Sequence, residues 1–188
     1  GAGGEYSYFE RHVHGSEGGV SLVPKTSVRV GAGARFNTEF ELIKGRVGRM
    51  DVDLNGVCMD RATMEVMARV SGAGDDSILI KEGCDLEGEH SRGVLTSHIA
   101  LKDSAQAEVY NTLSATGAYA RGHVDCKEIV LGQARARAVP VVDVRNPKAH
   151  VTHEAAIGSV DSKQLETLMS RGLSEDEASD LIVSGLLS

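Results

Sequence analysis

The sequence has few of the residues that disulfide-bonded, membrane and aromatic-rich proteins depend on. Its 188 residues include 3 Cys, 3 Pro, no Trp and 4% aromatic side chains. The cysteines are odd in number and lack CxxC spacing, which argues against a disulfide framework or a self-contained zinc module and favours a reducing cytoplasm. No run approaches the roughly 20 apolar residues of a membrane span, and no secretory leader is recognisable. We therefore expect a cytoplasmic protein that is not inserted in a membrane.

Charge and glycine content exclude further classes. The formal net charge is −7 and the basic residues are scattered, whereas a non-specific nucleic-acid binder would carry a clustered basic face. No phosphate-cradling GxxxxGK[ST] motif occurs, so any use of ATP would belong to a partner. With 22 Gly and few aromatic residues, the composition favours short stacked strands joined by tight turns.

Apolar and polar residues alternate through most of the chain. From about residue 5 to residue 158 the hydrophobic pattern has period two, interrupted by Gly, Asp or Asn. A weak repeat accompanies it, because residues 92–93 (RG) recur at 121–122 and residues 105–107 (AQA) recur at 134–136 (ARA), both offset by 29. Equal offsets indicate that 29 residues form one coil of a parallel β-helix, with each coil about 4.8 Å above the previous one. A β-sandwich is the alternative, because such short matches also arise by chance.

The pattern changes to helical spacing near the C-terminus. Asp161 or Ser162 can cap a first helix, which Gly172 ends. Ser174 and Glu177 form a capping box that opens a second helix.

These patterns divide the chain into two predicted domains. Residues 1–158 would form the mainly β core, and residues 159–188 a C-terminal helical hairpin. The hairpin would either cover an end of the β core or present its apolar stripe to a partner.

Four segments carry a resemblance to a known family. They are residues 38–48 (TEFELIKGRVG), 121–131 (RGHVDCKEIVL), 153–161 (HEAAIGSVD) and 164–178 (QLETLMSRGLSEDEA). Together they resemble the SufB/SufD scaffold proteins of the SUF iron–sulfur cluster assembly system. The resemblance implies a right-handed parallel β-helix followed by a small helical domain. It also implies a non-catalytic scaffold for nascent clusters, working with the ABC-type ATPase SufC docked on the C-terminal helices.

Some features separate this chain from longer members of that family. Such members carry additional N-terminal sequence with functional cysteines that have no counterpart here, so this chain would be a short member or a fragment. Thr152 stands where SufB-like sequences often have an acidic residue. A SufB-like role is favoured over a SufD-like one because Cys126 and Glu154 are both present.

The resemblance points to Cys126, His153 and Glu154 as the cluster site. Clusters bind to thiolates, sometimes with imidazole or carboxylate, so Cys126 and His153 would be metal ligands and Glu154 a ligand or proton acceptor. The coil length supports this grouping independently, because His153 and Glu154 follow Cys126 by 27 and 28 residues, nearly one coil. By the same arithmetic Ser97 and His98 should lie one coil below Cys126. A ladder of His98, Cys126 and His153 is conceivable.

Alternation along a strand limits what one chain can supply. The consecutive residues His153 and Glu154 should point to opposite faces, which leaves the cluster short of ligands. We expect the missing ligands from a second subunit, either another copy in a homodimer or a paralogous SufB/SufD chain. The cluster would be transient and would not survive aerobic purification, and a cysteine desulfurase is a possible source of its sulfur.

Each candidate residue also has a simpler interpretation. His153 could be a satisfied imidazole at the edge of the core, and Glu154 a solvated carboxylate. Cys126 could be a buried small hydrophobe, as free cysteines commonly are, and Cys58 and Cys84 are expected to be packing residues. His12 and His14 would share a strand face and could chelate a metal, although an ordinary exposed strand is the simpler account.

Two other functions compete with the scaffold. One is a β-helical carbohydrate-active or acyl-transfer enzyme that uses His153 and Glu154 as acid and base, which predicts a long groove lined with carboxylates or aromatic residues. The low aromatic content argues against sugar stacking. The other is a purely structural adaptor in which Cys126 is inert.

Overall fold

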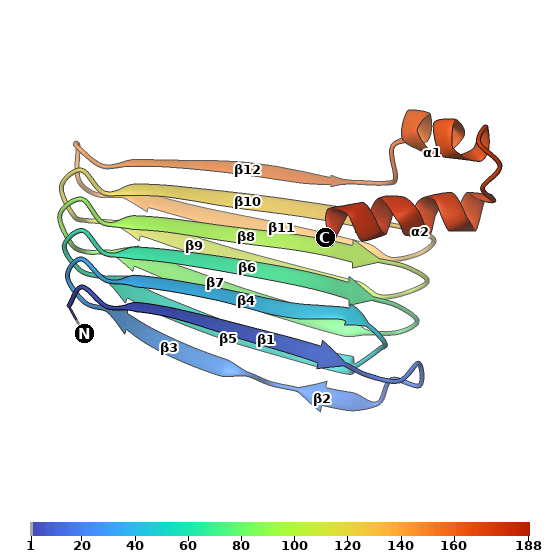
Figure 1. Ribbon diagram of the computed structural model, residues 1–188, viewed down its shortest axis with the longest axis horizontal. Helices are drawn as coiled ribbons and strands as arrows, with labels where there is room; N and C mark the ends of the chain where they lie inside the picture. The colour runs from blue at the N-terminus through green and yellow to red at the C-terminus, as the bar shows by residue number, and fades with distance from the viewer. Residues whose placement is uncertain (1) are drawn as a thin grey trace.

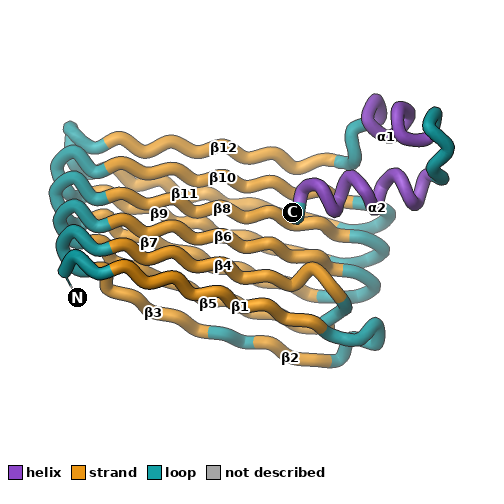
Figure 2. Tube along the Cα trace, viewed as in Figure 1, coloured by secondary structure: helices purple, strands orange, loops and turns teal. Residues whose placement is uncertain are grey.

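The computed structural model describes residues 2–188 as a coil of parallel strands in two sheets, followed by two helices (Figure 1, Figure 2). Sheet A has the strand order β1 (Glu5–Val13), β4 (Arg35–Lys44), β6 (Thr63–Gly72), β8 (Arg92–Leu101), β10 (Arg121–Val130) and β12 (His150–Gly158). Sheet B has the order β11 (Arg135–Val144), β9 (Gln106–Ala115), β7 (Ser77–Leu86), β5 (Gly48–Cys58) and β2 (Val20–Leu22), and β3 (Lys25–Val30) also pairs with β5.

The strand register confirms the predicted β-helix and excludes the β-sandwich. From β4 onward the chain passes alternately from one sheet to the other, and the strands of each sheet pair in parallel. Arg121 lies opposite Arg92, and Arg135 lies opposite Gln106, so both sheets repeat after 29 residues in the later coils, whereas the β4–β6 and β5–β7 pairs repeat after 28. The weak sequence repeat is therefore one coil. Most strands are ten residues long rather than short, because each coil has only two sides.

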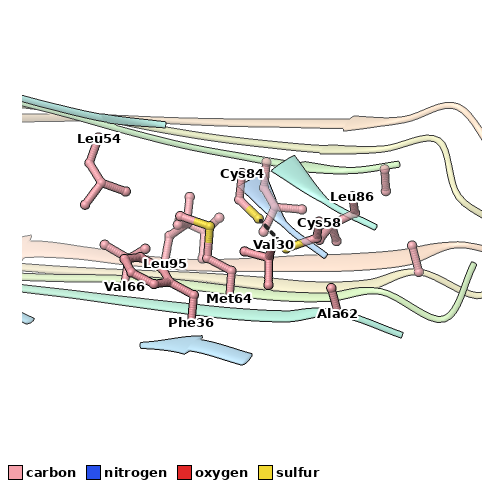
Figure 3. Close-up of a cluster of buried hydrophobic side chains, with 14 of the residues drawn as sticks. Val30, Phe36, Leu54, Cys58, Ala62, Met64, Val66, Cys84, Leu86 and Leu95 are labelled. Atoms are coloured by element: carbon pink, nitrogen blue, oxygen red, sulfur yellow. Dashed lines mark hydrogen bonds between the residues drawn. The ribbon is translucent and has the colours of Figure 1, made fainter. Parts of the chain in front are cut away.

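Mostly aliphatic side chains, large as well as small, fill the interior between the two sheets. In β6 the alternate residues Met64, Val66, Ala68 and Val70 all point inward and are buried. The core forms two clusters, one toward each end of the strands. Figure 3 shows part of one cluster, where Cys58 and Cys84 on adjacent coils bring their sulfur atoms within 3.9 Å. Both thiols are buried among apolar side chains, in the positions expected of packing residues.

Glycines allow the turns of successive coils to stack closely. A Cβ added at Gly88 would lie 2.0 Å from the backbone of Asp60, and one added at Gly117 would lie 2.0 Å from the carbonyl oxygen of Gly88. The two glycines are one coil apart. Backbone atoms cannot yield as a flexible side chain can, so these two turn positions exclude any larger residue.

The C-terminal segment forms the predicted helical hairpin. Helix α1 (Ser162–Met169) begins after Asp161, whose side chain accepts a hydrogen bond from the Gln164 amide at 2.8 Å. Gly172, with φ of +99°, lies three residues beyond the end of α1. Helix α2 (Glu175–Leu186) opens with the capping box of Ser174 and Glu177.

Helix α2 returns along the outer face of sheet A (Figure 1). Its last turn lies against β8, where the His98 ring and the Leu186 carbonyl oxygen are 3.1 Å apart. Within residues 2–188 no helix has the length and apolar character needed to cross a bilayer.

Candidate functional site

The pairing of β10 with β12 brings two of the predicted site residues onto adjoining coils. Cys126 lies opposite Ala155, and Val124 lies opposite His153. Cys126 and His153 therefore share the inward face and are diagonal neighbours, with their Cα atoms roughly 8 Å apart from the spacing of strands and residues. Cys126 is fully buried, whereas His153 is exposed at the end of the coil.

Glu154 points to the other face of the same strand. Its partner in the register is Asp125, on the outer surface of sheet A. The predicted division of His153 and Glu154 between opposite faces is therefore what the pairing produces. Cys126 and Glu154 lie on different sides of the sheet, so they do not approach one metal ion within one chain.

The coil below Cys126 contributes Ser97 but not His98. Ser97 is the register partner of Cys126 and is fully buried on the inner face. His98 pairs with Lys127 on the outer face, where its Nε2 atom lies 3.8 Å from a carboxylate oxygen of Asp125. Lys127 donates to the same oxygen at 3.0 Å. The conceivable ladder of His98, Cys126 and His153 is therefore not formed.

A buried polar network surrounds the Cys126 thiol. The thiol donates to Asn111 Oδ1 at 3.5 Å, and Asn111 Nδ2 donates to Glu82 Oε2 at 2.6 Å and to Ser97 Oγ at 3.0 Å. Ser97 Oγ donates in turn to Glu82 Oε2 at 3.1 Å. Four successive strands, β7 to β10, each provide one member. The network fixes the thiol on the inner side of β10.

Sequence reasoning missed Glu82 and Asn111. Both are buried polar residues at inward positions of sheet B, and they are opposite one another in the register. They are 29 residues apart, which is one coil. The sequence repeat could therefore have predicted that these two polar residues lie side by side on the inner face.

Glu128 is the second polar residue on the inner face of β10. It follows Cys126 by two residues, and only 2% of its surface is exposed. Both of its carboxylate oxygens are buried and have no hydrogen-bond partner among residues 2–188. A carboxylate in this state is uncommon, because burying a charge without a partner costs free energy.

Burial raises the pKa of three ionisable groups on the inner face. Burial raises the pKa of Glu82 to about 7, although the hydrogen bonds from Ser97 and Asn111 oppose the shift. Burial and the negative charge of Asp125 raise the pKa of Glu128 to about 7. Burial, followed by the nearby acidic groups, raises the pKa of Cys126 to about 12. Cys126 is therefore a neutral thiol near pH 7, and a bound cation would be needed to make it a thiolate.

No site for a metal ion is fully assembled by the described part of one chain. Residues 2–188 contain no group of three or more His, Cys, Asp or Glu side chains placed to hold an ion. At the other end of the coil, His12 and His14 lie with their rings stacked 5.9 Å apart, and His12 Nε2 lies 2.6 Å from Glu10 Oε1. The inner face of β10 thus provides a thiol and a carboxylate, and β12 adds the diagonal imidazole of His153.

A cavity of about 400 Å³ lies between α2 and the edge of the coil. Its lining includes Ile43, Ala100, Leu131, Asp180 and Val183. His153 and Glu154 are absent from that lining, so this cavity does not provide the groove that a carbohydrate-active enzyme would require.

Comparison with known proteins places the chain among iron–sulfur cluster assembly proteins. A family model described as "SUF system FeS cluster assembly, SufBD core domain" matches residues 2–186. An iron–sulfur cluster assembly SufBD family protein of Methanocaldococcus jannaschii is 37% identical over 187 residues, which cover 100% of this chain and 59% of that protein.

Two further relatives agree with this match. A SufBD family protein of Pyrococcus horikoshii is 39% identical over 181 residues, covering 96% of this chain and 55% of that protein. The iron–sulfur cluster assembly protein SufB of Bacillus subtilis is 27% identical over 164 residues, covering 70% of this chain and 35% of its own length. The chain spans little more than half the length of the two archaeal relatives.

Proposed function

Because the chain belongs to the SufBD family of the SUF iron–sulfur cluster assembly system, we propose that it is a scaffold on which nascent clusters are built. The observation that carries this proposal is the register of β10 and β12, which puts Cys126 and His153 on one face of adjoining coils. Thiolate and imidazole are both ligands of iron in clusters. We propose Cys126 and His153 as the ligands of one chain, with the scaffold itself performing no catalysis.

The neutral state of Cys126 fits a scaffold that must release its cargo. Burial favours the protonated thiol, so the thiolate persists only while iron is bound and is protonated again when the cluster leaves. Glu154, on the outer face beside Asp125, would serve as a proton acceptor or as a ligand presented to a second subunit. The cluster is transient cargo and is expected to be lost in air.

A second subunit would complete the ligand set. Among the described strands β12 pairs only with β10, so its other edge has free backbone donors and acceptors. Pairing of this edge across a two-fold axis would bring two copies of Cys126 and His153 together, or would join this chain to a paralogous SufB/SufD subunit. Light scattering of the whole protein should then give a dimer, and a monomer at every concentration would contradict this arrangement.

The helical hairpin would be the docking domain for a SufC-type ABC ATPase, with residues 1–158 as the cluster-bearing domain. Leu181 on α2 and Met169 on α1 are 52% and 42% exposed, so the hairpin presents apolar side chains to its surroundings. Leu181→Glu should abolish co-purification with the ATPase, whereas Asp176→Asn, at an exposed polar position of the same helix, should not. ATP hydrolysis and a cysteine desulfurase that supplies sulfur would belong to partners.

Anaerobic reconstitution with iron and sulfide tests the scaffold directly. The wild-type protein should develop cluster absorbance and bind iron and acid-labile sulfide. Cys126→Ala should lose most of both, and His153→Ala should lose part. Cys84→Ala is the matched control, because it removes another buried thiol from the same interior. Equal cluster content in wild type and Cys126→Ala would remove Cys126 from the ligand set.

A further inference from the structure

Among residues 2–188, Glu128 is the one carboxylate on the inner face whose oxygens are buried without a hydrogen-bond partner. Glu82 has the same chemistry and is also buried, but Ser97 and Asn111 donate to it. Glu128 has neither a hydrogen bond nor an ion pair for its two buried oxygens among residues 2–188. A buried acceptor that lacks a partner is destabilising, so an apolar residue at this position would serve packing better.

The surroundings of Glu128 in the sheet are apolar on both sides. Its register partners are Ile99 on the coil below and Ile157 on the coil above. Neither side chain can donate a hydrogen bond. The nearest group with ligand chemistry on its own strand is Cys126, two residues earlier on the same face.

The spacing of Cys126 and Glu128 suits a shared cation. Residues two apart on a strand point to the same side with Cα atoms roughly 6.6 Å apart, and the three-bond Glu side chain can span much of that distance. Both groups are buried on the same face of β10, where a thiolate and a carboxylate without a cation would repel each other strongly. A divalent cation between them would turn this repulsion into attraction.

We propose that Glu128 is a metal ligand that binds one iron(II) ion together with Cys126. The inference rests on the proposed function, because it takes Cys126 as an iron ligand and adds a residue to the site. On binding, the Cys126 S–H bond breaks, the sulfur bonds to iron and the proton leaves to solvent. One oxygen of ionised Glu128 bonds to the same ion. Iron remains in the +2 state, and water occupies its further positions.

The end of the coil provides the path to this pair. Sheet B ends at β11, whereas sheet A continues to β12, so only one strand covers the interior above Cys126 and Glu128. Ala155 and Ile157, the residues directly above the two ligands, are exposed. An ion would therefore enter from the β12 end, by a small displacement of this strand, rather than through either sheet.

Titration of the anaerobic, full-length protein with cobalt(II) alone tests the proposal. Cobalt(II) bound to a thiolate gives a charge-transfer band, so the readout follows the ion at Cys126 without any cluster assembly. Wild type should show this band. Glu128→Gln, which keeps the shape but removes the charge, should raise the dissociation constant by about tenfold or more, since loss even of an outer partner of a metal site typically costs 10–100-fold. Cys126→Ala should lose the band altogether.

Glu41→Gln is the matched control, because it neutralises a buried carboxylate that already has partners, Arg11 and Arg69, and that lies three coils away from Cys126. Its cobalt affinity should equal that of wild type. Circular dichroism and urea unfolding should show that Glu128→Gln is folded and close to wild type in stability, since the substitution replaces one buried polar group without a partner by another. Glu128→Ala is the second variant and should show the same loss of affinity.

The outcomes separate the two proposals. An unchanged cobalt band in Cys126→Ala, or no thiolate band in wild type, would overturn both. Loss of the band in Cys126→Ala with unchanged affinity in Glu128→Gln would overturn only the role of Glu128. Equal weakening by Glu41→Gln and Glu128→Gln would also overturn it, because the effect would then reflect loss of negative charge in general rather than ligation.

Discussion

Neutralising Glu82 should change how the stability of the protein depends on pH. Glu82 lies in the interior network with Ser97 and Asn111, and burial raises its pKa from 4.5 to about 7. The folded protein therefore binds the Glu82 proton more tightly than the unfolded chain does. The stabilisation is fully present below the unfolded pKa, is lost as pH rises toward 7, and remains lost at higher pH.

The size of this effect follows from the shift. A shift of about 2.5 units corresponds to about 3 kcal/mol, of which about 2.5 kcal/mol is lost between pH 5 and pH 8. Glu82→Gln removes this titration but retains an oxygen that can accept from Asn111 and Ser97. The added amide N–H groups lack an acceptor, which costs about 1 kcal/mol. The variant should therefore be slightly less stable than wild type at pH 5 and about 2 kcal/mol more stable at pH 8.

Urea unfolding of both proteins at a series of pH values measures the difference directly. Other titrating groups are common to wild type and variant, so their contributions cancel in the difference between the two free energies of unfolding. The sign of that difference should reverse between pH 5 and pH 8. A constant difference across this range would show that Glu82 does not titrate there and would refute the reasoning from burial.

Three further substitutions test the packing and the helix caps. Leu113→Ala truncates a fully buried core residue and should lower the free energy of unfolding by roughly 3 kcal/mol, measured with urea; a loss below about 1 kcal/mol would contradict tight packing. Gly117→Ala places a Cβ 2.0 Å from the Gly88 carbonyl oxygen and should lower the thermal midpoint, whereas unchanged melting would show that the turns do not stack this closely. Ser174→Ala removes the N-cap of α2 and should cost about 1 kcal/mol, seen as faster hydrogen exchange in α2 but not in β8; uniform exchange would contradict a local effect.

The repeat and the capping motifs made much of the fold predictable. An offset of 29 residues, read from two pairs of short matches, is the register of both sheets in the later coils. It correctly placed Ser97 beneath Cys126, and the capping box at Ser174 is present. These features are local or periodic, so one sequence is sufficient to reveal them.

The contents of the interior were harder to predict because they depend on which face each residue occupies. His98 has the right offset from Cys126 to lie close by, yet it is one residue out of phase with Ser97 and therefore points outward. Considered alone, Glu82 and Asn111 would be assigned to the surface because both are polar. They become interior residues only when the alternation of sheet B is followed from one coil to the next. In these cases the position of a residue was determined by the face of the strand on which it lies, rather than by its distance along the chain.

The same phase argument explains why the proposed ligands Cys126, Glu128 and His153 share one face near the end of the coil. The residue 29 positions after Cys126 is Ala155, so a small side chain lies in register with the fully buried thiol. His153, two residues before Ala155 on β12, and Glu128, two residues after Cys126 on β10, are displaced from the thiol in opposite directions along the strands. A shift of one residue in the pairing would turn His153 outward. The proposed ligands therefore share the inner face because each is displaced from the register of Cys126 by an even number of residues.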